Sequence, residues 1–375
     1  MQRDSAPAPE AEFLFRGHES DVRAVSFLPD GRGLLSADAA GVIVIWSLDT
    51  KRPLRKWQAH SRVIYAMEVI QGTSSAPTMS LMILSQARDG LLRVWDARQV
   101  MDVNVLNEDV QCVLELPVNP LTFCRFSWCV TNAPHHLLLA LSNLDNSERI
   151  DVYNLTQQQF ITKAIHTTLK SGMCLCTKLF NQPPPSDTST PKLAAGYEDG
   201  SVTIWAALHA SMIGRIDIFK EPIFSLDVHH EGLKGVAAGA ENRIATFSIE
   251  FDEAGSTKSL QYALLPSAGI ADVAIRGDGR IVATAGWDSK IRIFAMKKLR
   301  PLAVLTAHRD GVQCVAFAWK SHWPDSRERE NEWASLLATG SKDKRLLTRE
   351  TIRGEKIEEK KTPVQAHPGN PWMGT

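Results

Sequence analysis

The sequence predicts an all-β fold, a single closed β-propeller of seven blades. A hairpin unit recurs along the chain, and its clearest copy is ATAGWDSKIRIF at Ala283–Phe294. Aromatic residues end the third strand of most units, at spacings from 42 residues (Trp205 to Phe247) to 58 residues (Trp95 to Tyr153). The length of 375 residues suits seven units of this size. Hairpins repeated at such a period are typical of a propeller.

The recurring unit has three parts. In the clearest copy, a strand of small residues precedes a turn at Asp288, and Lys290–Phe294 then alternates apolar and polar residues. This alternation is typical of a half-buried strand. Related units run over Leu34–Trp46, Ile83–Trp95 and Leu193–Trp205, and another begins at Leu337–Asp343.

The first three blades follow from these units and their flanking turns. The first blade extends from Asp21 to Trp57, and the second opens at Ala59-His60 and ends its third strand at Trp95. The third blade has a weak repeat pattern, because it has no Gly-His start. Its expected strands are Thr122–Trp128, His136–Leu141 and Arg149–Tyr153.

The remaining four blades carry two insertions. The fourth starts at Ile165-His166 and ends its third strand at Trp205, the fifth covers Pro222–Phe247, the sixth covers Ile270–Phe294, and the seventh starts at Ala307-His308. The insertions at Asn181–Lys192 and Ser321–Trp333 are polar or proline-rich and are expected to be surface loops. We expect residues 1–11 to be disordered, residues 12–350 to form the propeller, and residues 351–375 to form a divergent, disordered tail.

Closure of the ring is assigned to the N-terminus. Phe13-Leu14-Phe15 precedes the first Gly-His, whereas the chain after Asp343 offers a weak last strand, with Arg349 where an aromatic residue is expected. An open ring would leave two unpaired strand edges. The sequence therefore predicts that Glu12–Arg16 pairs with the seventh blade, next to Arg345–Thr348.

Polar residues recur at fixed places in the units and predict a hydrogen-bond network inside each blade. The second blade has the full set of His, hydroxyl, Asp and Trp, while the first has His18, Ser36 and Trp46 but Ala40 at the Asp position. Such a chain satisfies buried polar groups and locks the strands together. The predicted network residues are His60, Ser85, Asp89, Trp95, His166, Asp199, Trp205, Thr284, Asp288, His308, Thr339 and Asp343.

A hydrolase with a Ser-His-Asp triad is the competing interpretation of these residues. Because the set repeats in several blades, and because the sequence lacks the G-x-S-x-G, H-E-x-x-H and P-loop motifs, we expect no enzyme, no cofactor and no metal site. Lys and Arg number 42, as do Asp and Glu, so no direct nucleic-acid binding is expected. No apolar run is long enough for a membrane span. Six cysteines without a C-x-x-C pair favour a reducing compartment.

The Gly-His starts, Asp-Gly turns and the Trp95-Asp96 end resemble WD-repeat proteins. Five longer stretches resemble the ASTRA-associated protein 1 family, also called the G-protein β-subunit-like protein 1 group: Ala195–Trp205, Gly269–Arg276, Ala283–Phe294, Pro301–Phe317 and Gly340–Arg345. The resemblance covers about residues 12–345. It implies a scaffold in the nucleus, and also in the cytoplasm, that belongs to the ASTRA chromatin-remodelling assembly. It further implies action with the TTT co-chaperone that matures phosphatidylinositol-3-kinase-like kinases.

A second function class stays open at this point. Trp95-Asp96-Ala97-Arg98 resembles the W-D-x-R box of substrate receptors of cullin-type ubiquitin ligases. The two classes differ in their expected partners: ASTRA subunits and the TTT co-chaperone for the scaffold, and a cullin adaptor for the receptor. Either way, the rims of the propeller are the expected binding surfaces.

Overall fold

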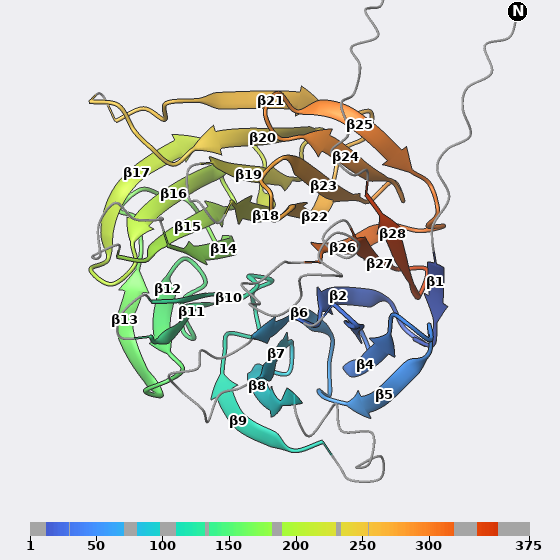
Figure 1. Cartoon of the computed structure of the whole chain (residues 1–375). Coiled ribbons are helices and arrows are strands. Elements are labelled where there is room, and N and C mark those ends of the chain that lie inside the picture. The colour runs from blue at the N-terminus through green and yellow to red at the C-terminus, as the bar shows by residue number, and fades with distance from the viewer. Residues whose placement is uncertain are drawn as a thin grey trace, which may run out of the picture.

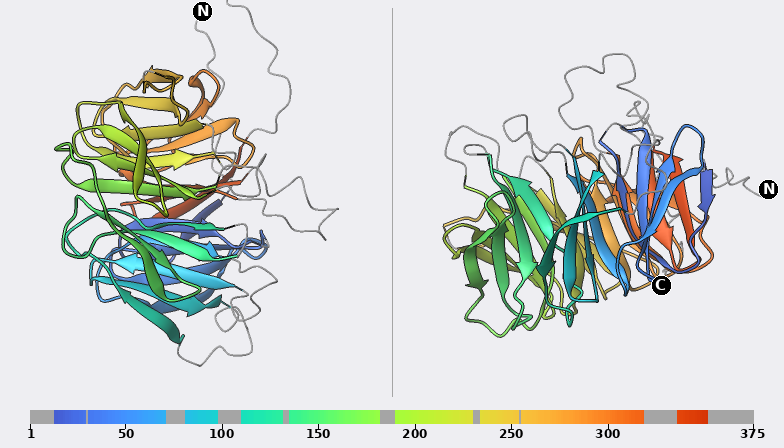
Figure 2. Two further views of the ribbon diagram at one scale, coloured as in Figure 1. Left: turned by 90° about the vertical axis from the view of Figure 1, so that its left-hand side faces the viewer. Right: turned by 90° about the horizontal axis from the view of Figure 1, so that it is seen from below.

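The structure, a computed structural model, describes residues 13–29, 31–70, 81–97, 110–131, 135–181, 190–229, 234–253, 255–318 and 336–351. In these residues, seven antiparallel sheets of four strands stand around a central channel (Figures 1 and 2). This confirms the predicted all-β, seven-bladed propeller. We number the blades 1 to 7 in chain order.

Each blade is an antiparallel meander that runs outward from the channel. Blade 1 consists of β2 (Val22–Phe27), β3 (Gly33–Asp38), β4 (Val42–Ser47) and β5 (Pro53–Gln58). Blade 2 consists of β6 (Ile64–Ile70), β7 (Met82–Ala87), β8 (Leu91–Asp96) and β9 (Cys112–Pro117). Blade 3 consists of β10 (Ser127–Val130), β11 (Leu137–Ser142), β12 (Ile150–Asn154) and β13 (Gln159–Ile165).

Blades 4 to 7 repeat this order. They consist of β14 (Cys174–Phe180), β15 (Lys192–Tyr197), β16 (Ser201–Ala206) and β17 (Ser211–Asp217); β18 (Ile223–Val228), β19 (Lys234–Gly239), β20 (Arg243–Ser248) and β21 (Leu260–Leu264); β22 (Ile270–Ile275), β23 (Ile281–Gly286), β24 (Ile291–Ala295) and β25 (Arg300–Leu305); and β26 (Val312–Phe317), β27 (Leu336–Ser341), β28 (Arg345–Glu350) and β1 (Phe13–Arg16).

The ring is closed by the N-terminal strand, as predicted. β1 pairs antiparallel with β28, in a register that places Phe13 opposite Thr348 and Arg16 opposite Arg345. Figure 1 shows β1 beside β28 at the outer edge of blade 7. The side chain of Phe15 is buried and packs on Trp46 of blade 1, with 5.3 Å between the ring centroids. β1 therefore completes blade 7 and also fastens it to blade 1.

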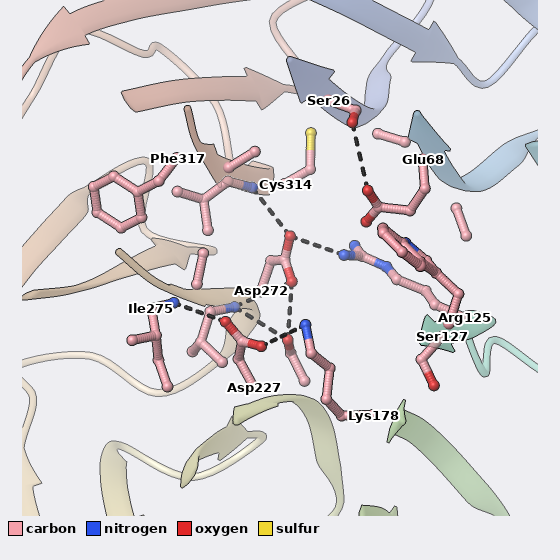
Figure 3. Close-up of a pocket in the computed structure, with 18 of the residues that line it drawn as sticks. Ser26, Glu68, Arg125, Ser127, Lys178, Asp227, Asp272, Ile275, Cys314 and Phe317 are labelled. Atoms are coloured by element: carbon pink, nitrogen blue, oxygen red, sulfur yellow. Dashed lines mark hydrogen bonds and ion pairs between the residues drawn. The ribbon is translucent and has the colours of Figure 1, made fainter. Parts of the chain in front are cut away.

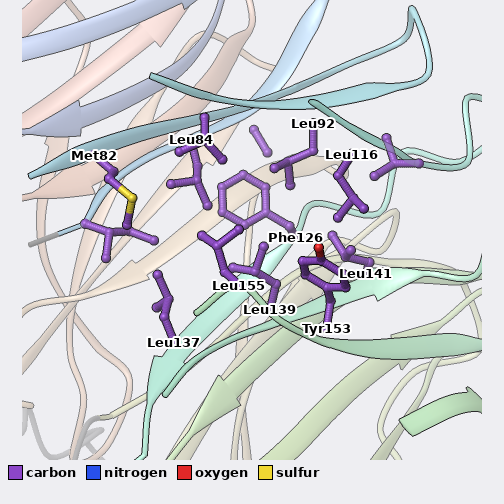
Figure 4. Close-up of a cluster of buried hydrophobic side chains, with 14 of the residues drawn as sticks. Met82, Leu84, Leu92, Leu116, Phe126, Leu137, Leu139, Leu141, Tyr153 and Leu155 are labelled. Carbon is purple, nitrogen blue, oxygen red and sulfur yellow. The ribbon is translucent and has the colours of Figure 1, made fainter. Parts of the chain in front are cut away.

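Blade 3 departs from the expected pattern at its inner strand. β10 begins at Ser127, so the expected strand over Thr122–Trp128 is too early and too long. The preceding residues form a wedge between blades 2 and 3, held by Gln86: the Phe126 amide donates to Gln86 Oε1 at 2.8 Å. Phe126 is buried among apolar side chains of both blades, including Leu84 and Leu139 (Figure 4). Phe126 therefore helps to join blade 2 to blade 3.

Candidate functional site

The polar network of blade 2 forms one continuous chain of hydrogen bonds. The Trp95 indole N–H donates to Ser85 Oγ at 2.9 Å, and Ser85 Oγ lies 2.8 Å from His60 Nε2. His60 Nδ1 lies 3.0 Å from an Asp89 carboxylate oxygen. Burial lowers the pKa of His60 and outweighs the attraction of Asp89, so the ring is neutral. A neutral ring donates to Asp89 from Nδ1 and accepts the Ser85 hydroxyl at Nε2.

Blade 1 has the same chain with a carboxylate that sequence reasoning missed. His18 Nδ1 lies 2.7 Å from Asp38, and Ser36 Oγ lies 2.6 Å from His18 Nε2 and accepts the Trp46 N–H at 2.7 Å. Ala40, at the position where an Asp was expected, has no carboxylate. Asp38, two residues upstream, binds His18 in its place. Burial raises the pKa of Asp38, yet hydrogen bonds from His18 and the backbone hold it below its ordinary value.

Blade 7 brings together its three predicted residues. His308 Nδ1 lies 3.1 Å from Asp343, and His308 Nε2 lies 2.9 Å from Thr339 Oγ1. Asp343 also accepts the backbone amides of Arg309 and Arg345. The carboxylate thereby ties the entry of β26 to the turn before β28.

Blade 4 does not form the predicted chain, and His166 has to be removed from it. The His166 side chain is exposed, and its Nδ1 contacts the Ala164 carbonyl at 2.8 Å. Asp199 instead binds Arg215 at 2.8 Å, while the Trp205 N–H donates to Thr203 at 2.7 Å. The physical reason is that Ala195 offers no hydroxyl to hold a histidine inside the blade.

Blade 6 replaces the missing histidine with an arginine. Arg292 makes two hydrogen bonds to Asp288, at 3.0 and 2.6 Å. The Arg292 guanidinium holds the pKa of Asp288 below its ordinary value. Thr284 is fully buried and donates to the Arg292 carbonyl at 3.4 Å, so it does not join Asp288 directly.

The hydroxyl groups of these networks cannot act as nucleophiles on a substrate. Ser36, Ser85 and Thr339 are each 0 % exposed. A catalytic hydroxyl has to touch the reacting atom of its substrate. The resemblance to a Ser-His-Asp triad therefore concerns residue types and does not extend to access.

The central channel is a cavity of the propeller. It has a volume of about 620 Å³ and is lined by the inner strands of all seven blades. Two ion pairs join side chains that line the channel (Figure 3). Arg125 Nη1 lies 2.8 Å from Asp272, and Lys178 Nζ lies 2.7 Å from Asp227. These residues come from four different blades, so the pairs join parts of the ring that are far apart in sequence.

The aspartates of both ion pairs also accept other hydrogen bonds. Asp272 also accepts from the Ser225 hydroxyl at 2.9 Å and from the Val315 amide at 3.0 Å. Asp227 accepts from the Ile275 amide at 2.9 Å. These hydrogen bonds and ion pairs hold the inner strands in register. Sequence reasoning missed this cluster, because its members, such as Arg125 and Asp272, lie far apart in the sequence.

Glu68 differs from the other channel carboxylates. Its only hydrogen bond among the described residues comes from Ser26, at a long 3.4 Å. Burial raises the pKa of Glu68 to about 7, and Lys178 offsets this only in part. The three Lys and Arg side chains that line the channel are each paired with an aspartate: Arg125 with Asp272, Lys178 with Asp227 and Arg276 with Asp278. Among the described residues no group of three or more side chains could hold a metal ion, and no helix is long and apolar enough to cross a membrane.

One face of the propeller presents aromatic side chains. We call it the entry face, because every inner strand begins there, and all of its connections belong to the described residues. Trp287 is 51 % exposed and stacks on Phe224, with 5.7 Å between the ring centroids. On blade 3, Phe123 is 60 % exposed and lies under the Arg88 guanidinium at 4.2 Å. Exposed aromatic residues and arginines are enriched at the centres of protein interfaces.

Comparison with known proteins agrees with this architecture. The family model described as WD domain, G-beta repeat matches residues 10–47, 260–294 and 299–347. The chain is 31% identical to guanine nucleotide-binding protein subunit beta-like protein 1 of Mus musculus, over 91% of this chain and 95% of that protein. It is 30% identical to ASTRA-associated protein 1 of Aspergillus flavus, over 83% of this chain and 84% of that protein. The protein of the same name from Schizosaccharomyces pombe is 27% identical, over 90% of this chain and 98% of that protein.

Proposed function

The chain belongs to the WD-repeat family that contains guanine nucleotide-binding protein subunit beta-like protein 1 and ASTRA-associated protein 1, and from this premise we propose that it is a non-catalytic scaffold subunit of an ASTRA-type assembly. The observation that carries the proposal is similarity to ASTRA-associated protein 1 of Schizosaccharomyces pombe over nearly the whole length of both chains, at 90% and 98%. Such coverage includes the rims that would bind partners as well as the blade cores.

The structure supports a binding role over a catalytic one. The hydroxyls of the blade networks are buried, the cations that line the channel are paired with aspartates, and the entry face exposes Trp287 and Phe123. A rigid ring with exposed aromatic residues is suited to holding other proteins in fixed positions. In this proposal the protein works in the nucleus, in chromatin remodelling. It acts there with the TTT co-chaperone in maturing phosphatidylinositol-3-kinase-like kinases.

Affinity purification of the tagged full-length chain from nuclear extract, followed by mass spectrometry, tests the proposal. We expect ASTRA subunits and TTT components in amounts comparable to the bait, and their absence from a tagged, unrelated seven-bladed propeller purified in parallel. Recovery of a cullin adaptor without TTT components would instead favour a ubiquitin-ligase receptor and overturn the scaffold proposal.

A further inference from the structure

One corner of the entry face, over blade 7, carries a group of cations without acidic partners. Its side chains are exposed or half-exposed, and in the part of the chain that the structure describes no ion pair joins any of them to a carboxylate. We call this group the basic corner; it consists of Arg16, Arg309, Lys342, Lys344 and Arg345. The same turns hold two acidic residues, Asp310 and Asp343, so the five cations still give the corner a local excess of positive charge in a chain of zero formal net charge.

The five cations lie together because both ends of the propeller meet there. Arg16 ends β1 and stands directly opposite Arg345 at the start of β28. Lys342 and Lys344 occupy the turn between β27 and β28, and the Arg309 amide donates to Asp343 in the same turn at 3.0 Å. The Asp343 carboxylate is itself committed to His308 and to backbone amides.

The pairing of Arg16 with Arg345 is unfavourable in the free protein. Side chains directly opposite each other on an antiparallel pair point to the same side of the sheet, and like charges in this position are destabilising. An anionic group bound between the two guanidinium groups would relieve the repulsion. The geometry thus favours a negatively charged partner at this position.

Trp287 lies next to the basic corner. The Lys342 amide donates to the Gly311 carbonyl at 3.1 Å, and a Cβ at Gly311 would lie 3.2 Å from the Trp287 carbonyl oxygen. The turns that carry Trp287 and Lys342 therefore meet at Gly311. Since Trp287 is 51 % exposed and stacks on Phe224, it offers a rigid apolar platform beside the cations.

We propose that the basic corner and Trp287 together form the docking surface for an acidic segment of a partner protein, which places an apolar side chain on Trp287 and carboxylates on the cations. The inference rests on the proposed scaffold function and deepens it by assigning the surface and the partner's chemistry. A protein segment fits better than a nucleic acid, because the platform for apolar contact is combined with a short, local charge excess in a neutral chain.

Direct binding to the purified full-length chain tests this assignment. The probe is a fluorescein-labelled synthetic peptide with a central leucine flanked by glutamates. Its binding is measured by fluorescence anisotropy at low ionic strength. We expect binding that weakens with added salt, because the contacts are largely ionic and exposed. Lys342→Glu with Lys344→Glu should weaken binding at least about tenfold, and Trp287→Ala several-fold. The matched control is Lys297→Glu with Lys298→Glu, two exposed lysines on the opposite face, which should bind as wild type.

Three results would overturn the proposal: no binding of the peptide to wild type, equal loss in both double variants, or tighter binding of a single-stranded oligothymidylate of equal charge. Thermal unfolding of each variant checks that the fold is intact. The same double variants, used as bait from nuclear extract, separate this proposal from the scaffold function. Unchanged recovery of the assembly by Lys342→Glu with Lys344→Glu would refute the surface alone, whereas failure of wild type to recover any assembly would refute the function.

Discussion

Removal of the N-terminal strand is the sharpest perturbation that the structure offers. Deleting residues 1–17 takes away β1, exposes the edge of β28 and uncovers Trp46. Phe15 is 1 % exposed, and Phe13 and Leu14 are half-buried. At about 1.5–3 kcal/mol for a fully buried side chain and about half of that for each half-buried one, the apolar loss alone is about 5 kcal/mol. This is comparable to the whole stability of many domains.

Urea-induced unfolding, monitored by tryptophan fluorescence, measures this loss as a lower midpoint. The single substitution Phe15→Ala should cost about 3–5 kcal/mol, because it leaves a cavity against Trp46. Phe160→Ala is the matched control: Phe160 is 38 % exposed on the outer strand β13 and packs on Tyr153 and Lys163, so its loss should cost about 1–2 kcal/mol, less than that of Phe15. Deletion of residues 352–375 should be tolerated. If that deletion lowered the midpoint more than deletion of residues 1–17, our account of ring closure would be wrong.

Three further predictions concern buried polar groups. Asp89→Ala should lower the free energy of unfolding by about 1–3 kcal/mol, because His60 loses its acceptor, whereas His166→Ala should change it by less than about 0.5 kcal/mol in the same denaturation assay. Arg125→Met should cost about 1–3 kcal/mol, because Asp272 loses its ion pair and keeps only the Ser225 and Val315 donors, and the added change Asp272→Asn should restore part of this; no restoration in the double-mutant cycle would contradict the pairing. The pKa of Glu68 is raised to about 7 in the fold, so its contribution is fully present below its unfolded pKa, near 4.5, and is lost as the pH rises through about 7. Wild type should therefore lose up to about 3 kcal/mol relative to Glu68→Gln between pH 5 and pH 8 in parallel denaturation series, and parallel curves would refute the raised pKa.

The blades could be predicted from sequence because their signals are local. The period-2 strands, the turn residues and the third-strand aromatics all lie within one hairpin, and the pairing of the N-terminal strand with β28 was predicted from Phe13-Leu14-Phe15 and the weak last strand. The inner strand of blade 3 was misplaced because Thr122–Phe126 has the composition of a strand. Its packing partner, Gln86, lies in another blade and leaves no mark on the segment itself.

The polar networks were predictable only in part. A fixed offset between hydroxyl and carboxylate finds Asp89 and Asp343 but overlooks Asp38, which reaches the same place from a shorter offset. The pattern also predicts His166 in the network, although its side chain is exposed because Ala195 offers no hydroxyl to bind it. The channel cluster could not be predicted at all, since its ion pairs join residues that only the closed ring brings together.

The junction between β1 and β28 has a consequence for synthesis of the chain. Phe13 pairs with Thr348, a separation of 335 residues, so during synthesis β1 waits for its partner β28. At about 5–20 residues per second, the wait is roughly 20–70 seconds. During that time Phe13, Leu14 and Phe15 have no strand to pair with, and the growing propeller keeps two open edges. The ring can therefore close only after β28 has been synthesised.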